Sequence, residues 1–292
     1  MILKSLLLFA LTLLLCSSVS AQKKNDRERQ SLTGAVKSIR SQMTRYAEVN
    51  SAEPADAKQL GTIVYDTNGN ETERTIYDDY GFLVGREVKT YDAKGNLTKG
   101  VMNDDKGKIM TRDNYVYAGG KLTQVITYDA KGAVSLRQLN LYAPDGRLQE
   151  QVYYVAKEPA GRTVFAYDRG DLSEVSFFLA NGAKAVAPVG PCLGAHRLTY
   201  TYDEKGRALK VVAYEPNGEV KRSWNYAYDP KGQVALDTRE SESSRVSLAY
   251  TYEYDARGNW TKQVAIITSQ YTLGDGETSK RKTVTTRDIA YY

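Results

Sequence analysis

The chain has 292 residues, a formal net charge of +5 and one histidine. Its 40 basic and 35 acidic side chains are interleaved and do not gather into one stripe, which argues against a nucleic-acid-binding protein. With one His and two Cys, the sequence also excludes a zinc site built from several His and Cys ligands, and we expect neither a metal nor a cofactor.

Residues 1–21 are typical of an export signal. Lys4 is their only charged residue, residues 6–15 are almost entirely apolar, and small residues precede the end of the segment at Ala21. The apolar stretch is shorter than the roughly 20 residues that cross a bilayer, so we expect no transmembrane span after signal removal. We therefore predict an exported bacterial protein that is periplasmic, on the outer surface or extracellular.

Cysteine use agrees with this prediction. Cys16 lies inside the signal, where a lipoprotein anchor is the alternative, although Leu15 stands where such signals carry a small residue. After cleavage only Cys192 would remain, so no internal disulfide could form and the fold would depend on burial and hydrogen bonding. We interpret Cys192 as a small buried residue.

The N-terminal part of the mature chain changes character twice. Residues 22–31 are polar, and we predict a flexible leader there because they offer nothing to bury. Residues 32–46 have apolar side chains at helical spacing, but Gly34 and the Ser and Thr content favour a strand. A loop should follow over residues 50–57. We treat residues 32–292 as a single β-repeat domain.

A short phrase, Tyr-Asp-x-x-Gly, recurs between about residues 59 and 262. It begins at Tyr65, Tyr77, Tyr91, Tyr128, Tyr202, Tyr228 and Tyr254. Asp suits the first position of a type I turn and Gly the fourth, and a left-handed Gly then closes a hairpin loop with a bulge. Proline supports this geometry, because Pro144, Pro216 and Pro230 occupy the second turn position. We predict tandem β-hairpins.

Spacing preserves one face of these hairpins. The marker glycines are mostly 12 or 14 residues apart, and the distance from Gly to the next Tyr is even, as from Gly120 to Tyr128. Because side chains alternate along a strand, even spacing keeps Leu and Tyr on the same side. The predicted fold is all-β: an antiparallel meander of tandem hairpins that curls into a solenoid-like or barrel-like sheet, with tyrosines filling the inner side.

The repeats at residues 91–97, 142–148 and 202–209 resemble the YD repeats of RHS-type bacterial surface and secreted proteins. The resemblance covers about residues 59–262. It implies a curling β-sheet shell and, in some members, carbohydrate binding. The chain is far shorter than the large closed shells and shows no toxin domain, so the resemblance does not imply toxin delivery.

Catalytic patterns are scarce. There is no Gly-x-Ser-x-Gly elbow and no phosphate loop. The acid pairs at residues 78–79 and 104–105, and the calcium-loop-like residues 66–71, all fall in repeat turns. We predict no enzyme and name no catalytic residue. A hydrolase that uses acids near His196 is the least favoured reading.

Candidate binding residues are aromatic or lie where the repeat is interrupted. Trp260 takes a position that Leu97 holds in its own repeat, Tyr254 opens the same unit, and Trp224 lies one repeat earlier. His196 belongs to the irregular connector at residues 183–197. Polar loops are expected at residues 239–245 and 274–282, with a closing strand over 283–292.

These features favour a secreted, non-enzymatic module that binds a glycan or a cell-envelope partner through Trp224, Trp260, His196 and Tyr254. Aromatic faces stack on sugars, and tyrosine adds a polar group. The alternative is a structural or assembly protein that presents a curved sheet or a sheet edge to another protein.

Overall fold

The structure is a computed structural model that describes residues 24–78, 80–187, 194–271 and 278–292. The predicted signal, Cys16 and Cys192 lie outside these residues. Those described form eighteen strands and one short helix, and none of their helices is long and apolar enough to cross a membrane. The predicted all-β class is therefore confirmed.

The chain divides into two compact units, although the sequence analysis treated residues 32–292 as one domain. Of the described residues, unit 1 contains 138–246 and 270–271, and unit 2 contains 24–78, 80–137, 247–269 and 278–292. Three strands run across these boundaries: β8 (Val134–Tyr142), β16 (Ser244–Tyr254) and β17 (Trp260–Tyr271).

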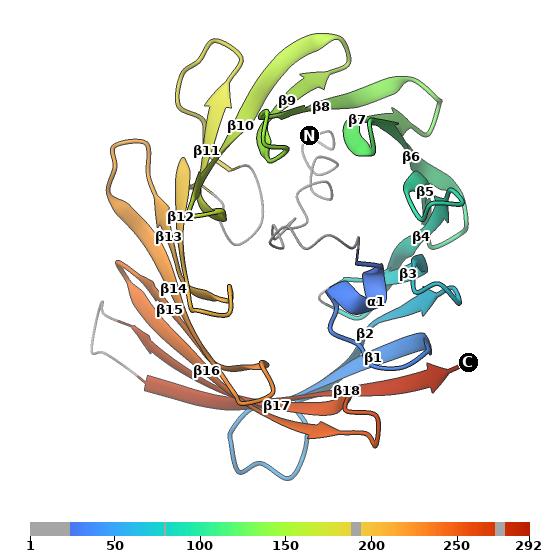
Figure 1. The fold of residues 1–292 in the computed structure, drawn as a ribbon. Helices are drawn as coiled ribbons and strands as arrows, with labels where there is room; N and C mark the ends of the chain where they lie inside the picture. The colour runs from blue at the N-terminus through green and yellow to red at the C-terminus, as the bar shows by residue number, and fades with distance from the viewer. Residues whose placement is uncertain (1–23, 79, 188–193, 272–277) are drawn as a thin grey trace. The chain divides into compact units, whose positions relative to one another are not determined.

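Unit 2 is a run of antiparallel hairpins. Its other strands are β1 (Val36–Tyr46), β2 (Asp56–Tyr65), β3 (Glu71–Tyr77), β4 (Leu83–Tyr91), β5 (Leu97–Asp104), β6 (Ile109–Ala118), β7 (Lys121–Asp129) and β18 (Thr278–Tyr291). Strands β2 to β7 pair in chain order, and β1 lies between β2 and β18 (Figure 1). The strand predicted near the N-terminus is confirmed, and the closing strand begins earlier than expected.

Unit 1 follows the same plan. Its strands are β9 (Leu148–Val155), β10 (Glu158–Asp168), β11 (Asp171–Leu179), β12 (Arg197–Tyr202), β13 (Ala208–Tyr214), β14 (Val220–Tyr228) and β15 (Val234–Ser241), each antiparallel to the next. The prediction of a polar loop over residues 239–245 is wrong, because β15 continues to Ser241 and β16 starts at Ser244. A two-residue turn replaces the missing repeat turn.

The Asp-x-x-Gly turns have the predicted geometry. In the turn after β4 the Gly95 amide donates to the Asp92 carbonyl at 3.0 Å and the Asp92 amide donates to the Asn96 carbonyl at 2.9 Å. The Asp92 carboxylate also accepts from the Lys94 and Asn96 amides, at 2.9 and 2.8 Å. Gly95 has a φ of +70°, and a register shift at Thr90 and Tyr91 marks the bulge. Sequence alone therefore predicted this turn.

The tyrosines share a face but do not fill a closed core. Along β16 the side chains of Tyr250, Tyr252 and Tyr254 are half-buried while the residues between them are exposed. Among the described tyrosines only Tyr65 is fully buried. The densest packing lies elsewhere, in a unit 1 cluster that includes Leu172, Val175, Phe177, Leu198 and Trp224. The prediction that tyrosines fill the inner side of the sheet as a core is wrong for most of the described tyrosines.

The hydroxyl group explains where several tyrosines are used instead. Tyr91, Tyr167 and Tyr228 lie at or next to the end of a strand, and each donates at 2.8 Å to the carbonyl of the first residue of the preceding strand. The acceptors are Glu71, Leu148 and Ala208. A buried hydroxyl needs such a partner. These three tyrosines therefore tie their strands to the backbone of the preceding strand.

The polar leader is partly ordered, so the prediction of a flexible segment at residues 22–31 is wrong for its central part. Asp26–Arg29 form helix α1, which Asn25 and Glu28 close with a capping box. The buried Arg27 side chain donates to the Val36 and Thr67 carbonyls at 3.1 and 2.8 Å. The prediction considered only the burial of apolar side chains, whereas hydrogen bonds hold this helix to the rest of unit 2.

Candidate binding site

The four predicted binding residues fall into two groups. Trp224 and His196 belong to unit 1, and Trp260 and Tyr254 belong to unit 2. The two groups differ in exposure, and this difference decides which of them can contact a ligand.

In unit 1 both side chains are enclosed. Trp224 on β14 is buried in the apolar cluster of that unit. The buried His196 ring has Nδ1 2.9 Å from the Ala185 carbonyl, and Phe178 packs edge-on against it with ring centroids 5.4 Å apart. The described contacts of this ring include no carboxylate. Trp224 and His196 therefore hold the connector and β14 together, and they present little surface to a ligand.

In unit 2 four aromatic residues form what we call the aromatic row: Tyr250, Tyr252, Tyr254 and Trp260. The three tyrosines alternate along β16 and so point to the same side. Ring centroids are 6.4 Å apart for Tyr250 and Tyr252 and 6.2 Å apart for Tyr252 and Tyr254. Trp260 meets Tyr252 in a T-shaped contact at 6.0 Å. All four side chains are half-buried. The structure thus brings two predicted residues, Tyr254 and Trp260, into one continuous surface.

Polar contacts fix part of this row. The Gln263 side-chain amide on β17 donates to the Tyr252 hydroxyl at 3.1 Å. Since Tyr252 also contacts both of its neighbours and Trp260, its ring is held from several sides. A pre-formed aromatic surface loses little side-chain entropy when a ligand binds.

Arg287 on β18 completes the row, and sequence analysis missed it. Its guanidinium carbon lies 3.4 Å from the centroid of the Trp260 ring. Among the residues that the structure describes, the Arg287 side chain has no hydrogen-bond or ion-pair partner, and its Nε is buried. Burial lowers the pKa of Arg287 to about 10, which leaves it charged at neutral pH. The sequence did carry one signal for Arg287. On the closing strand it alternates with Ile289 and Tyr291, so these three side chains lie on the same side of the strand.

Tyr65 connects the row to a neighbouring polar cluster. It is fully buried and its hydroxyl has no described partner. Burial raises the pKa of Tyr65, Glu71 raises it further, and the positive charges of Arg74 and Arg287 oppose that shift. The charges of Glu71 and Arg74 in the polar cluster and of Arg287 in the aromatic row therefore all act on Tyr65.

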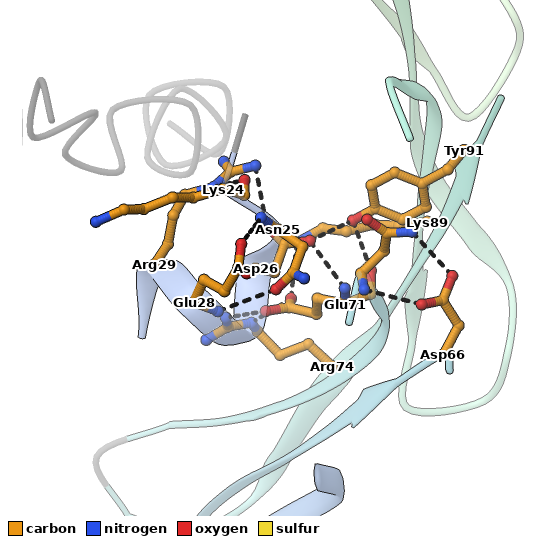
Figure 2. Close-up of polar contacts among 11 residues, drawn as sticks. Lys24, Asn25, Asp26, Glu28, Arg29, Asp66, Glu71, Arg74, Lys89 and Tyr91 are labelled. Carbon is orange, nitrogen blue, oxygen red and sulfur yellow. Dashed lines mark hydrogen bonds and ion pairs between the residues drawn. The ribbon is translucent and has the colours of Figure 1, made fainter. Parts of the chain in front are cut away.

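Figure 2 shows the polar cluster beside α1, which we call the Glu71 network. The Glu71 carboxylate accepts from Arg74 at 2.9 and 2.6 Å and from Lys89 at 2.7 Å. The Asp26 carboxylate accepts from the Glu71 amide at 2.8 Å and from the Tyr91 hydroxyl at 2.9 Å. Burial favours a higher pKa for Glu71, but Arg74 and Lys89 outweigh it and hold the pKa below its ordinary value. The network is a set of paired charges that anchors the N-terminal helix.

The described residues include no group of three or more His, Cys, Asp or Glu side chains placed to hold a metal ion. The acids of the Glu71 network have cationic or hydrogen-bonding partners. The aromatic row, in contrast, presents stacking surfaces and an arginine without an acid. Groups of this kind can stack on other rings and attract anions.

Comparisons with known proteins give distant likenesses. No family model matches the sequence, and no curated protein matches it. A porin-like protein from Bacteroides uniformis has 15% identity and a TM-score of 0.45, and the match covers 88% of this chain and 99% of that one. A Tc holotoxin pore chain from Photorhabdus luminescens has 12% identity and a TM-score of 0.30, covering 82% of this chain and 18% of that one.

A LolA superfamily protein from Nitrosomonas europaea has 9% identity and a TM-score of 0.22, and the match covers 88% of this chain and 87% of that one. At these values none of the three structures defines a function for the chain.

Proposed function

We propose that this protein is an exported, non-enzymatic β-repeat module that binds a glycan of the cell envelope, and that it belongs with the YD-repeat proteins its turns resemble. The observation that carries the proposal is the aromatic row of Tyr250, Tyr252, Tyr254 and Trp260. The signal-like residues 1–21 support export.

The row has the properties that glycan recognition needs. The apolar face of a sugar ring packs on an aromatic ring, and a tyrosine adds a polar group at the edge of that surface. Small-molecule sites commonly combine aromatic walls with a few placed polar groups, and here Gln263 and Arg287 supply them. Half-burial holds the rings in place and leaves part of each surface open.

Binding can be measured by calorimetry against a panel of soluble polysaccharides and peptidoglycan fragments. We expect the wild type to bind at least one of them, and Trp260→Ala and Tyr254→Ala to weaken that binding about tenfold or more, since a lost ring contact is worth on the order of 1–2 kcal/mol. Circular dichroism and thermal unfolding would establish that each variant is folded.

Tyr271→Ala is the matched control, because this tyrosine is exposed and lies outside the aromatic row. It should bind like the wild type. Absence of binding across the panel, or equal binding by the control and the row variants, would contradict the proposed function.

A role in assembly is the second candidate, and one observation favours it. Tyr80 and Phe82, in the turn between β3 and β4, are 84% and 72% exposed. Exposed aromatic pairs are typical of protein contact sites. If this role is correct, Tyr80→Ser with Phe82→Ser should abolish co-purification of a stoichiometric partner, while the Trp260→Ala variant should retain it. A monomeric wild type with no partner would exclude this role.

A further inference from the structure

Arg287 differs from other arginines in its surroundings. Arg207 pairs with Asp203 at 2.6 Å and Arg239 pairs with Asp237 at 2.7 Å. Arg287 is also largely shielded from water, yet no acid contacts it in the described part of the chain. Removing a charge from water without a partner is costly, so buried charges are normally paired. The unpaired state of Arg287 therefore needs a reason.

In the described part of the chain no carboxylate neutralises it. The titratable groups that act on Arg287 are the hydroxyls of Tyr65 and Tyr252, which are neutral at pH 7, and no acid is among them. Glu71, which acts on Tyr65, is held by Arg74 and Lys89. Among the residues that the structure describes, no acid neutralises this guanidinium, so its charge is available to an external anion.

The donors of Arg287 point to the geometry of that counter-charge. Trp260 packs against the guanidinium, and the buried Nε is directed away from water. The two terminal nitrogens have no described partner and are not among the buried unpartnered atoms, so they are open to solvent. Two parallel donors in one plane match the two oxygens of a carboxylate, which arginine binds in a bidentate manner.

We propose that the glycan is acidic: a carboxylate-bearing sugar of the uronic acid type stacks on the aromatic row and places its carboxylate on the terminal nitrogens of Arg287. This inference rests on the proposed function and specifies its ligand class. The row supplies the surface for the ring, and Arg287 supplies selectivity for charge. Because ion pairing at a partly dry site is strong, charge should matter more here than at an exposed lysine.

The test uses two polymers with the same sugar backbone, oligogalacturonate and its fully methyl-esterified form, and measures both affinities at pH 7. We expect wild-type protein to bind the acid form about tenfold or more tightly than the ester. Arg287→Met should abolish this preference and Arg287→Lys should retain part of it, because lysine keeps the charge and loses the planar fork.

Arg222→Met is the matched control, since Arg222 also lies over a tryptophan, Trp224, at 5.9 Å but in unit 1. It should keep the full preference. If Arg287→Met fails to fold, the Arg287→Lys variant and the salt dependence of the wild type still decide, because the preference must shrink as ionic strength rises.

Each outcome has one meaning. Equal wild-type affinity for acid and ester overturns the acidic-glycan inference and leaves glycan binding standing. Failure to bind either polymer overturns this inference, and if the wider polysaccharide panel also fails, the proposed function falls with it. A sulfated polymer that displaces oligogalacturonate at lower concentration would overturn the assignment to a carboxylate and retain the anion site.

Discussion

Replacing Glu71 by Gln tests whether the Glu71 network stabilises unit 2. The change keeps the shape of the side chain and removes its charge, so Arg74 and Lys89 lose their shared carboxylate. The Glu71 side chain is only 4% exposed, whereas Lys89 is 18% exposed and Arg74 is 40% exposed. The three groups will therefore respond differently to the loss.

The expected cost follows from these exposures. Breaking a fully buried ion pair costs about 3–5 kcal/mol, and an exposed pair contributes about 0–1 kcal/mol. Arg74 can turn to water, and Lys89 keeps a second acid, Glu87, at 3.3 Å. We therefore expect Glu71→Gln to lower the free energy of unfolding by about 2 kcal/mol, or the thermal midpoint by about 4–8 °C for a chain of this size.

The pH dependence gives a second measure. The pKa of Glu71 lies below its ordinary value of 4.5, so the folded protein binds this proton more weakly than the unfolded chain. The stabilisation is complete above that ordinary value and is lost as the pH falls through the lowered folded pKa. The gap between wild type and Glu71→Gln, measured by chemical denaturation, should be constant from pH 6 to 8 and should narrow below about pH 4.5.

Glu73→Gln on the same strand is the control. Glu73 pairs with Arg86, whose side chain is 55% exposed, and we expect a loss of no more than about 0.5 kcal/mol. Equal losses for the two variants, or a Glu71→Gln gap that stays constant in acid, would show that the network does not stabilise the fold in the way its geometry indicates.

Four further substitutions, with Tyr128→Phe as a control, probe the repeat and the helix. Tyr228→Phe removes the hydroxyl bond to the preceding strand and should cost about 1 kcal/mol in urea unfolding. Tyr128→Phe should change little, because the Tyr128 hydroxyl has no hydrogen bond in the described structure. Gly107→Ala, at a φ of +81° in open space, should cost about 1–2 kcal/mol. Gly85→Ala should lower the thermal midpoint further, because the new Cβ would lie 2.0 Å from a backbone oxygen. Asn25→Ala should speed hydrogen exchange in α1 by about fivefold, the equivalent of about 1 kcal/mol, if the capping box holds that helix.

Local chemistry was predictable because it is encoded in adjacent residues. The turn at Asp92 and Gly95 needs one acceptor and one left-handed backbone position, and both are visible in the phrase itself. Even spacing likewise determined which side of β16 carries Tyr250 and Tyr254. These features depend on neighbours in the chain, so no knowledge of the tertiary arrangement was required.

Features that join distant segments were missed. Helix α1 is held by the Thr67 carbonyl, 40 residues away from Arg27, and nothing in the polar leader indicates that acceptor. Arg287 is one of many basic residues until Trp260 is placed against it. Sequence reasoning found Trp260 from its position in the repeat, but it gave the same weight to Trp224, which is buried. Burial depends on pairings that the phrase does not encode.

The two uses of tyrosine explain why a repeat rich in this residue can leave a surface for ligands. A motif tyrosine such as Tyr228 donates its hydroxyl to the backbone of the preceding strand, so it stabilises the sheet from a half-buried position. Tyr250 and Tyr252 lie outside the turn phrase, on the same side of β16 as the motif tyrosine Tyr254. Because strand pairing and the tyrosine ties hold the sheet, such additional rings contribute stacking surface instead of core. Arg287 adds a positive charge to the aromatic row. This charge distinguishes the row from the other stacked pair, Tyr200 and Tyr202 in unit 1.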